Sequence, residues 1–284
     1  MQTIIADDFG LCPTHDAVIL KLLERGSIDG TSVFVDAPIN KNTLEHIVNL
    51  REERLCKVGL HLNLTENFTN KTNYPSVSKL LLKSVFGQLS RSSLAKDIWR
   101  QFDQFHNLFG FHPDYLDGHQ HCHIFPIIAQ ELAQVVEARD LGHSFWVRYP
   151  DEVSTKGVVK SYLSGGLKAL IVSRFAQRTR IHFESRDITM NKTFAGFLNL
   201  NADKDVFAKD FVSMLSNAPA DAVIMVHPGS EDSKVLMRGH KNALRSIEAS
   251  VLSQHKLLNE KLKNPIFTDK ISVYTDQHKR NNKT

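Results

Sequence analysis

The stretch Tyr115-Leu116-Asp117-Gly118-His119-Gln120-His121-Cys122-His123 joins a short apolar segment to a carboxylate and three imidazoles. In an extended chain, alternate side chains share a face, so we expect the carboxylate and all three imidazoles to point the same way and Cys122 to point away. Pro126 follows at a position that suits the first turn of a helix. A strand, a polar exit and a helix in this order predict one βα unit of a parallel sheet.

The same pattern recurs along the chain. Buried or alternating apolar runs predict strands over residues 3–6, 31–35, 57–62, 115–116, 144–147, 222–226 and 271–274. Helical periodicity and stop signals predict helices over residues 14–25, 43–54, 92–109, 126–141, 164–178, 203–216 and 242–263, with Thr14 as the cap of the first. The stretch 63–88 is polar and rich in Asn, and we expect an irregular surface excursion there.

About seven βα units predict a (β/α) barrel-like fold, with roughly seven parallel strands and outer helices. A doubly wound open sheet is the competing architecture. The chain has 284 residues and no internal repeat or linker, so we expect residues 1–284 to form a single domain. The basic end, residues 277–284, is expected to be a flexible tail.

Composition narrows the class of protein. The net charge is +4, and the basic residues are scattered among acidic ones, so we expect no nucleic-acid partner. Three cysteines without a Cys-x-x-Cys pair favour a reducing compartment. We find no leader with an apolar core and no apolar stretch of membrane-spanning length. We therefore expect a cytoplasmic protein without a membrane partner.

Polar side chains follow four of the predicted strands. They are the pair Asp7-Asp8, His61, the run that starts at Asp117, and His227 before Pro-Gly. Each has an ordinary interpretation on its own: a turn, a core histidine, a solvated loop, or a strand stop. In parallel α/β folds, however, the carboxyl ends of the strands meet at one edge and carry the functional groups. We therefore expect these residues to converge.

The chemistry of the four groups indicates a metal-dependent hydrolase. Two adjacent carboxylates such as Asp7 and Asp8 repel each other unless a cation or proton lies between them. One carboxylate and two imidazoles leave open positions on an ion, as in catalytic sites, and they suit Zn²⁺, Mn²⁺ or Mg²⁺. The sequence lacks the phosphate-binding and serine-nucleophile motifs of other enzyme classes. Spacing alone does not choose among His119, His121 and His123 as the ligand.

The sequence resembles the YdjC-type carbohydrate deacetylases over most of its length, and the middle, about 151–201, resembles them weakly. The similar motifs are Ala6-Asp7-Asp8-Phe9-Gly10-Leu11, Thr31-Ser32, Gly59-Leu60-His61-Leu62-Asn63-Leu64, Asp117-Gly118-His119-Gln120-His121-Cys122-His123 with Pro126, Arg148, and Met225-Val226-His227-Pro228-Gly229. Gly118 and Gln120 stand where the family often has Ser and His. The resemblance implies a barrel-like fold, a divalent metal ion, usually Mg²⁺, and removal of acetyl groups from N-acetylated sugars.

The resemblance also implies roles for individual residues. The metal ligands would be Asp8, His61 and His119. Asp7 would be the general base and His227 the general acid. Arg148 would orient that base or bind the substrate.

Other roles and functions stay open. His121 and His123 would support the ligands or the substrate. A homodimer is compatible with the resemblance. Two alternative functions share the residues: a non-catalytic carbohydrate- or metal-binding protein on the same scaffold, and a metal phosphoesterase. Asp7 favours the enzyme, because a binding protein needs no base beside its ligand aspartate. The absence of an Arg or Lys cluster beside the motifs disfavours the phosphoesterase.

Overall fold

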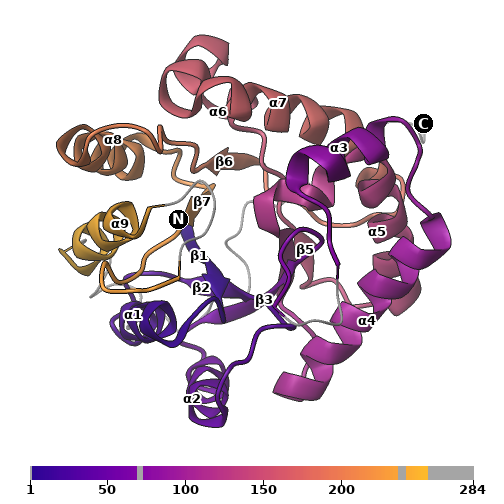
Figure 1. Ribbon diagram of the computed structural model, residues 1–284, viewed down its shortest axis with the longest axis horizontal. Helices are drawn as coiled ribbons and strands as arrows, with labels where there is room; N and C mark the ends of the chain where they lie inside the picture. The colour runs from indigo at the N-terminus through magenta and orange to yellow at the C-terminus, as the bar shows by residue number, and fades with distance from the viewer. Residues whose placement is uncertain (1, 69–72, 236–240, 255–284) are drawn as a thin grey trace, which may run out of the picture.

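The computed structural model describes residues 2–68, 73–235 and 241–254. Within them, seven parallel strands form one curled sheet in the order β5-β4-β3-β2-β1-β7-β6, and helices surround it (Figure 1). The expected (β/α) barrel-like class is confirmed. The strands are β1 (Thr3–Phe9), β2 (Gly30–Val33), β3 (Lys57–Leu62), β4 (Tyr115–Gly118), β5 (Trp146–Val147), β6 (Thr193–Ala195) and β7 (Ala222–Val226).

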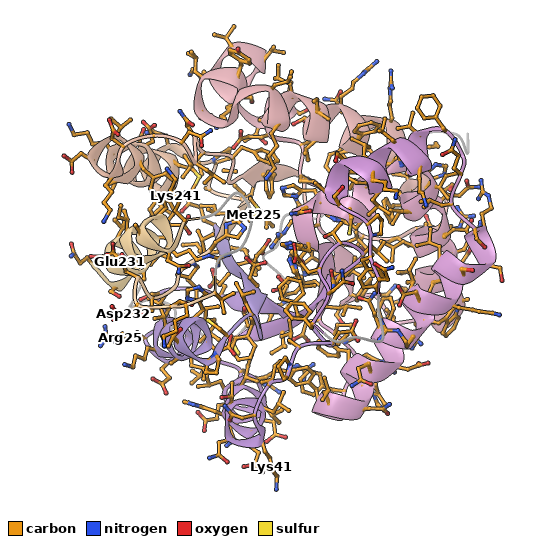
Figure 2. All side chains as sticks on the ribbon, in the orientation of Figure 1. Arg25, Lys41, Met225, Glu231, Asp232 and Lys241 are labelled. Carbon is orange, nitrogen blue, oxygen red and sulfur yellow. The ribbon has the colours of Figure 1, made fainter. Side chains whose placement is uncertain are left out.

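The helices lie outside the sheet, as their amphipathic sequences require. They are α1 (Pro13–Glu24), α2 (Lys41–Glu52), α3 (Val77–Val85), α4 (Arg91–Phe109), α5 (Pro126–Arg139), α6 (Glu152–Lys156), α7 (Val158–Glu184), α8 (Lys204–Asn217) and α9 (Asn242–Gln254), with a 3-10 helix, η1 (His119–Ile124), after β4. Figure 2 shows charged side chains such as Lys41 and Glu231 projecting from the outer rim, whereas Met225 of β7 lies near the centre.

Side chains alternate along each strand, and the inner set builds the barrel in layers. Ile5, Tyr115, Trp146 and Val223 form a small apolar cluster of their own, separate from the large core under the helices. The rings of Tyr115 and Trp146 stack at 4.8 Å between centroids. Gly59 is required beside them, because a Cβ there would lie 2.3 Å from the Tyr115 ring. We call this cluster the floor of the barrel, because a layer of polar residues, described below, lies directly above it.

The two edges of the sheet are tied together by the segment that precedes β6. Val147 of β5 forms a parallel bridge with Met190, three residues before β6 starts on the opposite edge. The buried Asn191 side chain accepts a hydrogen bond from the Tyr149 amide at 2.7 Å and donates to the Tyr149 and Thr193 carbonyls at 3.0 and 2.9 Å. The sheet therefore curls round on itself, and the open doubly wound alternative is wrong.

Some boundaries differ from the expected ones. The stretch 63–88 is not irregular throughout, because α3 forms within it and buries Leu80 and Ser84. The first helix is capped by Cys12 rather than Thr14, since Pro13 occupies its first turn. The short β6 and α6 were not expected, and α7 is longer at both ends than 164–178. The predicted strand 271–274, the end of helix 242–263 and the tail 277–284 lie outside the described residues.

None of the helices in the described ranges has the length and apolarity needed to cross a bilayer.

The contacts between Tyr149, which follows β5, and Asn191, which precedes β6, join the two edges of the sheet. We call these contacts the seam of the barrel, and they predict how much Asn191 contributes to the free energy of unfolding. Asn191→Ala removes three hydrogen bonds, two of them buried, and leaves the buried Tyr149 amide without a partner, whereas the Tyr149 carbonyl keeps the Asp151 amide as a donor. Leaving buried polar groups unpaired is expensive, so we expect a loss of about 3 kcal/mol in the free energy of unfolding, measured by urea denaturation. Asn201→Ala, at an exposed turn, is the matched control and should change it by less than about 0.5 kcal/mol. Equal effects of the two substitutions would show that Asn191 does not hold the seam.

Candidate active site

A layer of charged and polar residues lies directly above the apolar floor of the barrel. Asp7 follows Ile5 by two residues, Asp117 follows Tyr115, and Arg148 follows Trp146, so period-two alternation points all three to the inside. Each of the three is at least 98% buried. Charged groups this deep need strong partners, and here they are one another.

Arg148 joins the two carboxylates. Its guanidinium donates to both oxygens of Asp7 at 2.7 Å and lies 2.7 Å from Asp117 Oδ2. The Ser32 hydroxyl donates to Asp117 Oδ2 at 2.8 Å. A planar guanidinium suits such bidentate contacts. Since Arg148 is only 1% exposed, its position favours the expected role of orienting Asp7 over contact with substrate.

Asp8, next in sequence, points to a different place because the backbone is irregular there. The pairing of β1 with β2 shifts register between Ala6 and Phe9, and Asp8 has a left-handed φ of 70°. A non-glycine residue in this region is uncommon and often marks a functional site. The bulge lets both carboxylates of the pair face the carboxyl ends of the strands.

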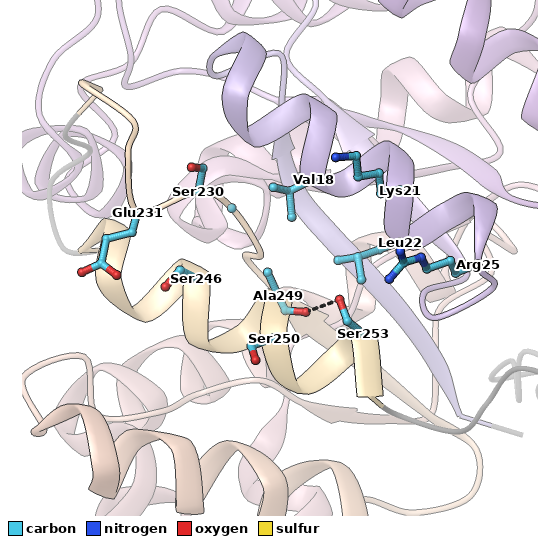
Figure 3. Close-up of a pocket in the computed structure, with 11 residues that line it drawn as sticks. Val18, Lys21, Leu22, Arg25, Ser230, Glu231, Ser246, Ala249, Ser250 and Ser253 are labelled. Atoms are coloured by element: carbon cyan, nitrogen blue, oxygen red, sulfur yellow. Dashed lines mark hydrogen bonds between the residues drawn. The ribbon is translucent and has the colours of Figure 1, made fainter.

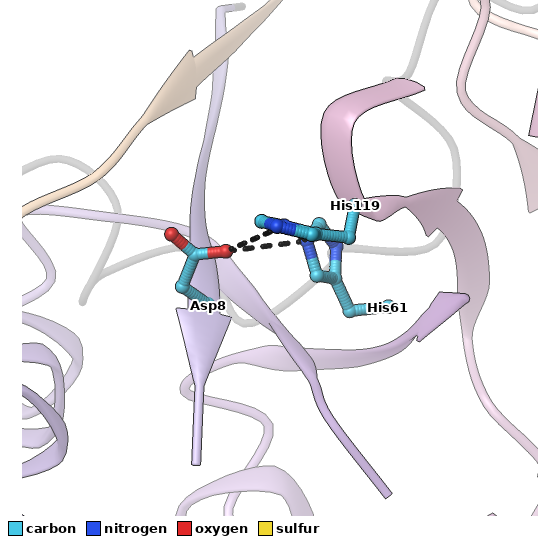
Figure 4. Close-up of side chains that lie close together, drawn as sticks. All are labelled: Asp8, His61 and His119. Carbon is cyan, nitrogen blue, oxygen red and sulfur yellow. Dashed lines mark hydrogen bonds and ion pairs between the residues drawn. The ribbon is translucent and has the colours of Figure 1, made fainter. Parts of the chain in front are cut away.

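Asp8, His61 and His119 meet in a triangle (Figure 4). Asp8 Oδ1 lies 3.3 Å from His61 Nε2 and 3.3 Å from His119 Nδ1, and the two ring nitrogens are 3.4 Å apart. All three residues are buried, and Asp8 Oδ1 has no hydrogen bond of good geometry in the described part of the chain. Two ligands about 2.0–2.1 Å from a common ion are separated by about 3–3.5 Å. The triangle could therefore hold a divalent ion.

The neighbours of the triangle orient its donors. His61 Nδ1 is 2.5 Å from Asp117 Oδ1, so the proton on that nitrogen faces the carboxylate and Nε2 is free to bind an ion. This carboxylate–histidine arrangement is the usual support of a metal-binding imidazole. His119 Nε2 lies 3.7 Å from Glu66 Oε1 and has no hydrogen-bond partner among the described residues. Only His61 therefore has a carboxylate within hydrogen-bond distance of the nitrogen that faces away from the triangle.

Electrostatics also favour a cation in this place. Burial alone would raise the pKa of Asp8, but the Arg245 guanidinium at 2.5 Å and the two imidazoles outweigh it and hold that pKa well below its usual value. Burial lowers the pKa of His61, yet Asp117 and the other carboxylates raise it to about 10. Without an ion, a protonated His61 thus supplies the positive charge that three buried carboxylates require.

Asp7 and His227 lie beside the triangle. Burial raises the pKa of Asp7 despite the opposing charge of Arg148. His227 Nε2 is 4.0 Å from Asp7 Oδ2, and its side chain is 20% exposed, far more than those of the other expected site residues. The backbone amide of His227 donates to the Glu248 carboxylate of α9. His227 is therefore held at the solvent-facing side of the site.

The side chains of Asp117, His119, His121 and His123 were expected to lie on one face, and that expectation is wrong. The strand ends at Gly118, and η1 follows with left-handed Gln120 and His121, which breaks the alternation. His123 is fully buried and donates from Nε2 to the Arg148 carbonyl at 2.9 Å, and a Cβ on Gly118 would meet its ring at 2.8 Å. His121 packs edgewise on Phe197 and its Nδ1 has no partner among the described residues. Cys122 is buried and contacts the Leu62 carbonyl.

The structure brings together all six expected site residues and adds others that the sequence did not single out. Arg245, Glu248 and Glu66 contact Asp8, His227 and His119. They lie on α9 and on the loop after β3, where no motif marks them. A separate groove of about 360 Å³ between α1 and α9, lined by residues such as Lys21, Leu22 and Ser250, contains none of the site residues (Figure 3).

Comparisons with known proteins agree with these motifs. The profile of a family described as YdjC-like protein matches residues 3–261. Carbohydrate deacetylase from Mus musculus is 25% identical over 250 residues, which cover 80% of this chain and 77% of the relative. Chitooligosaccharide deacetylase from Proteus mirabilis is 28% identical over 172 residues, 55% of this chain and 64% of the relative.

One solved structure supports the fold. A crystal structure from Enterococcus faecalis, of a protein described as a candidate for cellobiose-phosphate cleavage, aligns with a TM-score of 0.56 and covers 93% of each chain. The two sequences are 17% identical, so the likeness shows the architecture alone.

The contact between the Asp117 carboxylate and His61 Nδ1 predicts that Asp117 affects the affinity for a metal ion. Asp117→Asn weakens the acceptor behind His61 Nδ1, and we expect binding of Zn²⁺ or Mn²⁺ to weaken by about 10–100-fold in calorimetric titration. Asp103→Asn, an exposed carboxylate paired with Arg139, is the matched control and should leave the affinity unchanged. Wild-type affinity in the Asp117 variant would contradict this assignment.

The raised pKa of His61 predicts proton release on metal binding. Between the usual imidazole value and about 10, His61 is protonated without an ion, and binding through Nε2 displaces that proton. We expect about one proton released per ion near pH 8, and less as the pH rises through 10. Titrations in two buffers of different ionisation enthalpy measure this number. No net release near pH 8 would show that His61 is neutral or is not a ligand.

Proposed function

The chain belongs to the YdjC-like family, and from that premise we propose that it removes acetyl groups from N-acetylated carbohydrates by metal-dependent hydrolysis. The products are acetate and a free amino sugar. The relatives named carbohydrate deacetylase and chitooligosaccharide deacetylase support this reaction class. The observation that carries the proposal is the triangle of Asp8, His61 and His119 with Asp7 and His227 beside it.

Asp8, His61 and His119 would hold the ion. When bound, a divalent ion supplies Lewis-acid chemistry for the acetamide carbonyl and lowers the pKa of water. The family resemblance favours Mg²⁺. Two imidazoles among three ligands suit Zn²⁺ or Mn²⁺ better, because Mg²⁺ prefers oxygen donors. Metal competition in solution would decide between them.

Asp7 is the proposed general base. A carboxylate whose pKa is raised by burial takes up a proton more readily near neutral pH than an ordinary aspartate. The bidentate contact with Arg148 fixes the plane of the carboxyl group, and Oδ2 lies 4.0 Å from His227 Nε2. Asp7 would accept the proton of the attacking water at this oxygen.

His227 is the proposed general acid. Its imidazole is the most exposed of the site and lies 4.0 Å from Asp7, so it can reach a sugar that enters from solvent. It would donate its proton to the departing sugar nitrogen as the carbon–nitrogen bond breaks. The contact between its amide and Glu248 holds the backbone in place during this step.

The two alternatives lose support from the same geometry. A binding protein needs no buried carboxylate of raised pKa next to its ligand aspartate. A two-metal phosphoesterase would need a second ion site. Asp7, His61 and Asp117 form a second cluster of ligand types among the described residues, but Arg148 already lies 2.7 Å from both carboxylates and would repel a cation.

We also propose a reducing, cytoplasmic setting. All three cysteines, Cys12, Cys56 and Cys122, are free and buried. Burial raises the pKa of the Cys56 thiol to about 12, so it stays protonated and unreactive.

The role of Asp7 predicts a separation of metal binding from turnover. In Asp7→Asn the base is lost while the ion ligands remain, so we expect acetate release from chitobiose to fall at least about 100-fold with metal binding retained. The assay follows acetate with and without a chelator, and Asp103→Asn is again the control. Near-wild-type rates in the Asp7 variant would refute its role. Acetate release that a chelator does not reduce would refute the metal dependence.

A further inference from the structure

Exposed apolar side chains concentrate on two helices. Thirteen large hydrophobic side chains of the described residues are exposed, and nine of them lie on α3 with its cap or on the first half of α7. We call these nine the rim strip: Leu82, Val85, Phe86, Val158, Val159, Tyr162, Leu163, Leu167 and Ile171. Leu163 and Val159 are 74% and 70% exposed. Isolated exposed apolar residues are ordinary, but a concentration like this marks an interaction surface.

The charge of the same two segments is one-sided. Helix α3 contains Lys79 and Lys83 and no Asp or Glu, and α7 contains five Lys or Arg and one acidic residue, Glu184, which pairs with Arg180. The two helices together carry +6 and the whole chain carries only +4, so all other residues together carry −2. In the described structure, Lys160, Arg174 and Arg178 of α7 form no salt bridge. Exposed cations and exposed apolar side chains thus occur together on α3 and α7, and their natural partner is both anionic and apolar.

The rim strip lies at the mouth of the barrel. The segments that carry α3 and α7 follow the carboxyl ends of β3 and β5, and both helices pack against η1, which carries His119. Gly165 of α7 contacts Phe197, whose ring contacts His121. Figure 1 shows both helices on the same side of the molecule. A partner bound to the strip would therefore lie beside the entrance to the site.

We propose that the rim strip docks on a bilayer of anionic lipids, with the mouth of the barrel toward the headgroups. Interfacial helices combine basic residues with a protruding apolar face, and anionic headgroups attract the cations while the apolar side chains enter the acyl boundary. A nucleic acid would use the cations but leave Leu163 and Phe86 in water. A second copy of this chain would bring the same excess of positive charge against itself. The bilayer satisfies both features at once.

This proposal departs from the expectation of no membrane partner, which rested on the lack of an apolar stretch of membrane-spanning length. Docking on a bilayer surface needs no such stretch. The proposal of membrane docking does not depend on which reaction the site at the mouth of the barrel catalyses. If the proposed deacetylation holds as well, the bound orientation favours an N-acetylated sugar carried on a lipid over a free oligosaccharide, a statement that rests on the proposed function.

Co-sedimentation with vesicles tests the surface directly. The full-length protein is mixed with vesicles of phosphatidylcholine and phosphatidylglycerol, or of phosphatidylcholine alone. We expect binding to the anionic vesicles only, weakened by high salt. Leu163→Glu should weaken it at least about tenfold, and Lys160→Gln about fivefold. The matched controls on α8, Val212→Glu and Lys209→Gln, change exposed residues away from the strip and should bind like the wild type.

Three outcomes would overturn the proposal. The first is no binding to anionic vesicles by the folded wild-type protein, and the second is equal loss in the α8 controls. The third is a lipid-free dimer, seen by sedimentation velocity, that Leu163→Glu dissociates, because the strip would then be covered by a second copy. Thermal unfolding shows whether each variant is folded. If Leu163→Glu does not fold, the comparison of Lys160→Gln with Lys209→Gln still tests the proposal. Vesicle binding requires no substrate, so its result is separate from that of acetate release.

Discussion

Two buried arginines hold three buried carboxylates at the carboxyl ends of the strands, and the rest of the site depends on this arrangement. Arg148 lies between Asp7 and Asp117, and Arg245 contacts Asp8. Removal of one partner from such a pair typically costs about 3–5 kcal/mol, because the other charge stays buried and unpaired. The arginines compensate only part of the negative charge. The remainder is met by a protonated His61 or by a divalent ion, which explains why the site favours a cation.

The barrel places these charged side chains together at the carboxyl ends of its strands. Alternation along the strands sets Asp7, Asp117 and Arg148 directly above the floor of Ile5, Tyr115 and Trp146, so water is excluded from below. The bulge at Asp8 turns the neighbouring carboxylate to the ion triangle instead. Two adjacent aspartates thereby acquire different surroundings and opposite pKa shifts, raised in Asp7 and lowered in Asp8. Such a division between a base and a ligand is typical of enzymes that work near neutral pH.

The sequence predicted that the site residues lie close together, but it did not predict the residues that contact and orient them. The placement of Asp8, His61 and His227 at strand ends follows from apolar runs that stop at polar residues, and the choice of His119 came from family resemblance. The left-handed turn at Gln120 and His121 could not be foreseen, because alternation predicts a straight strand. Arg245 lies 237 residues from Asp8, and only the packing of α9 brings them together. The strand predicted over 144–147 corresponds to β5, whereas the three-residue β6 is too short for periodicity to define.

Anomalous X-ray scattering from crystals soaked in Mn²⁺ or Zn²⁺ would locate the bound ion directly. We expect one strong peak within coordination distance of an Asp8 carboxylate oxygen, His61 Nε2 and His119 Nδ1, with Arg148 still between Asp7 and Asp117. A peak among Asp7, His61 and Asp117, with the guanidinium displaced, would contradict it. So would the absence of any ion at the three ligands under saturating metal.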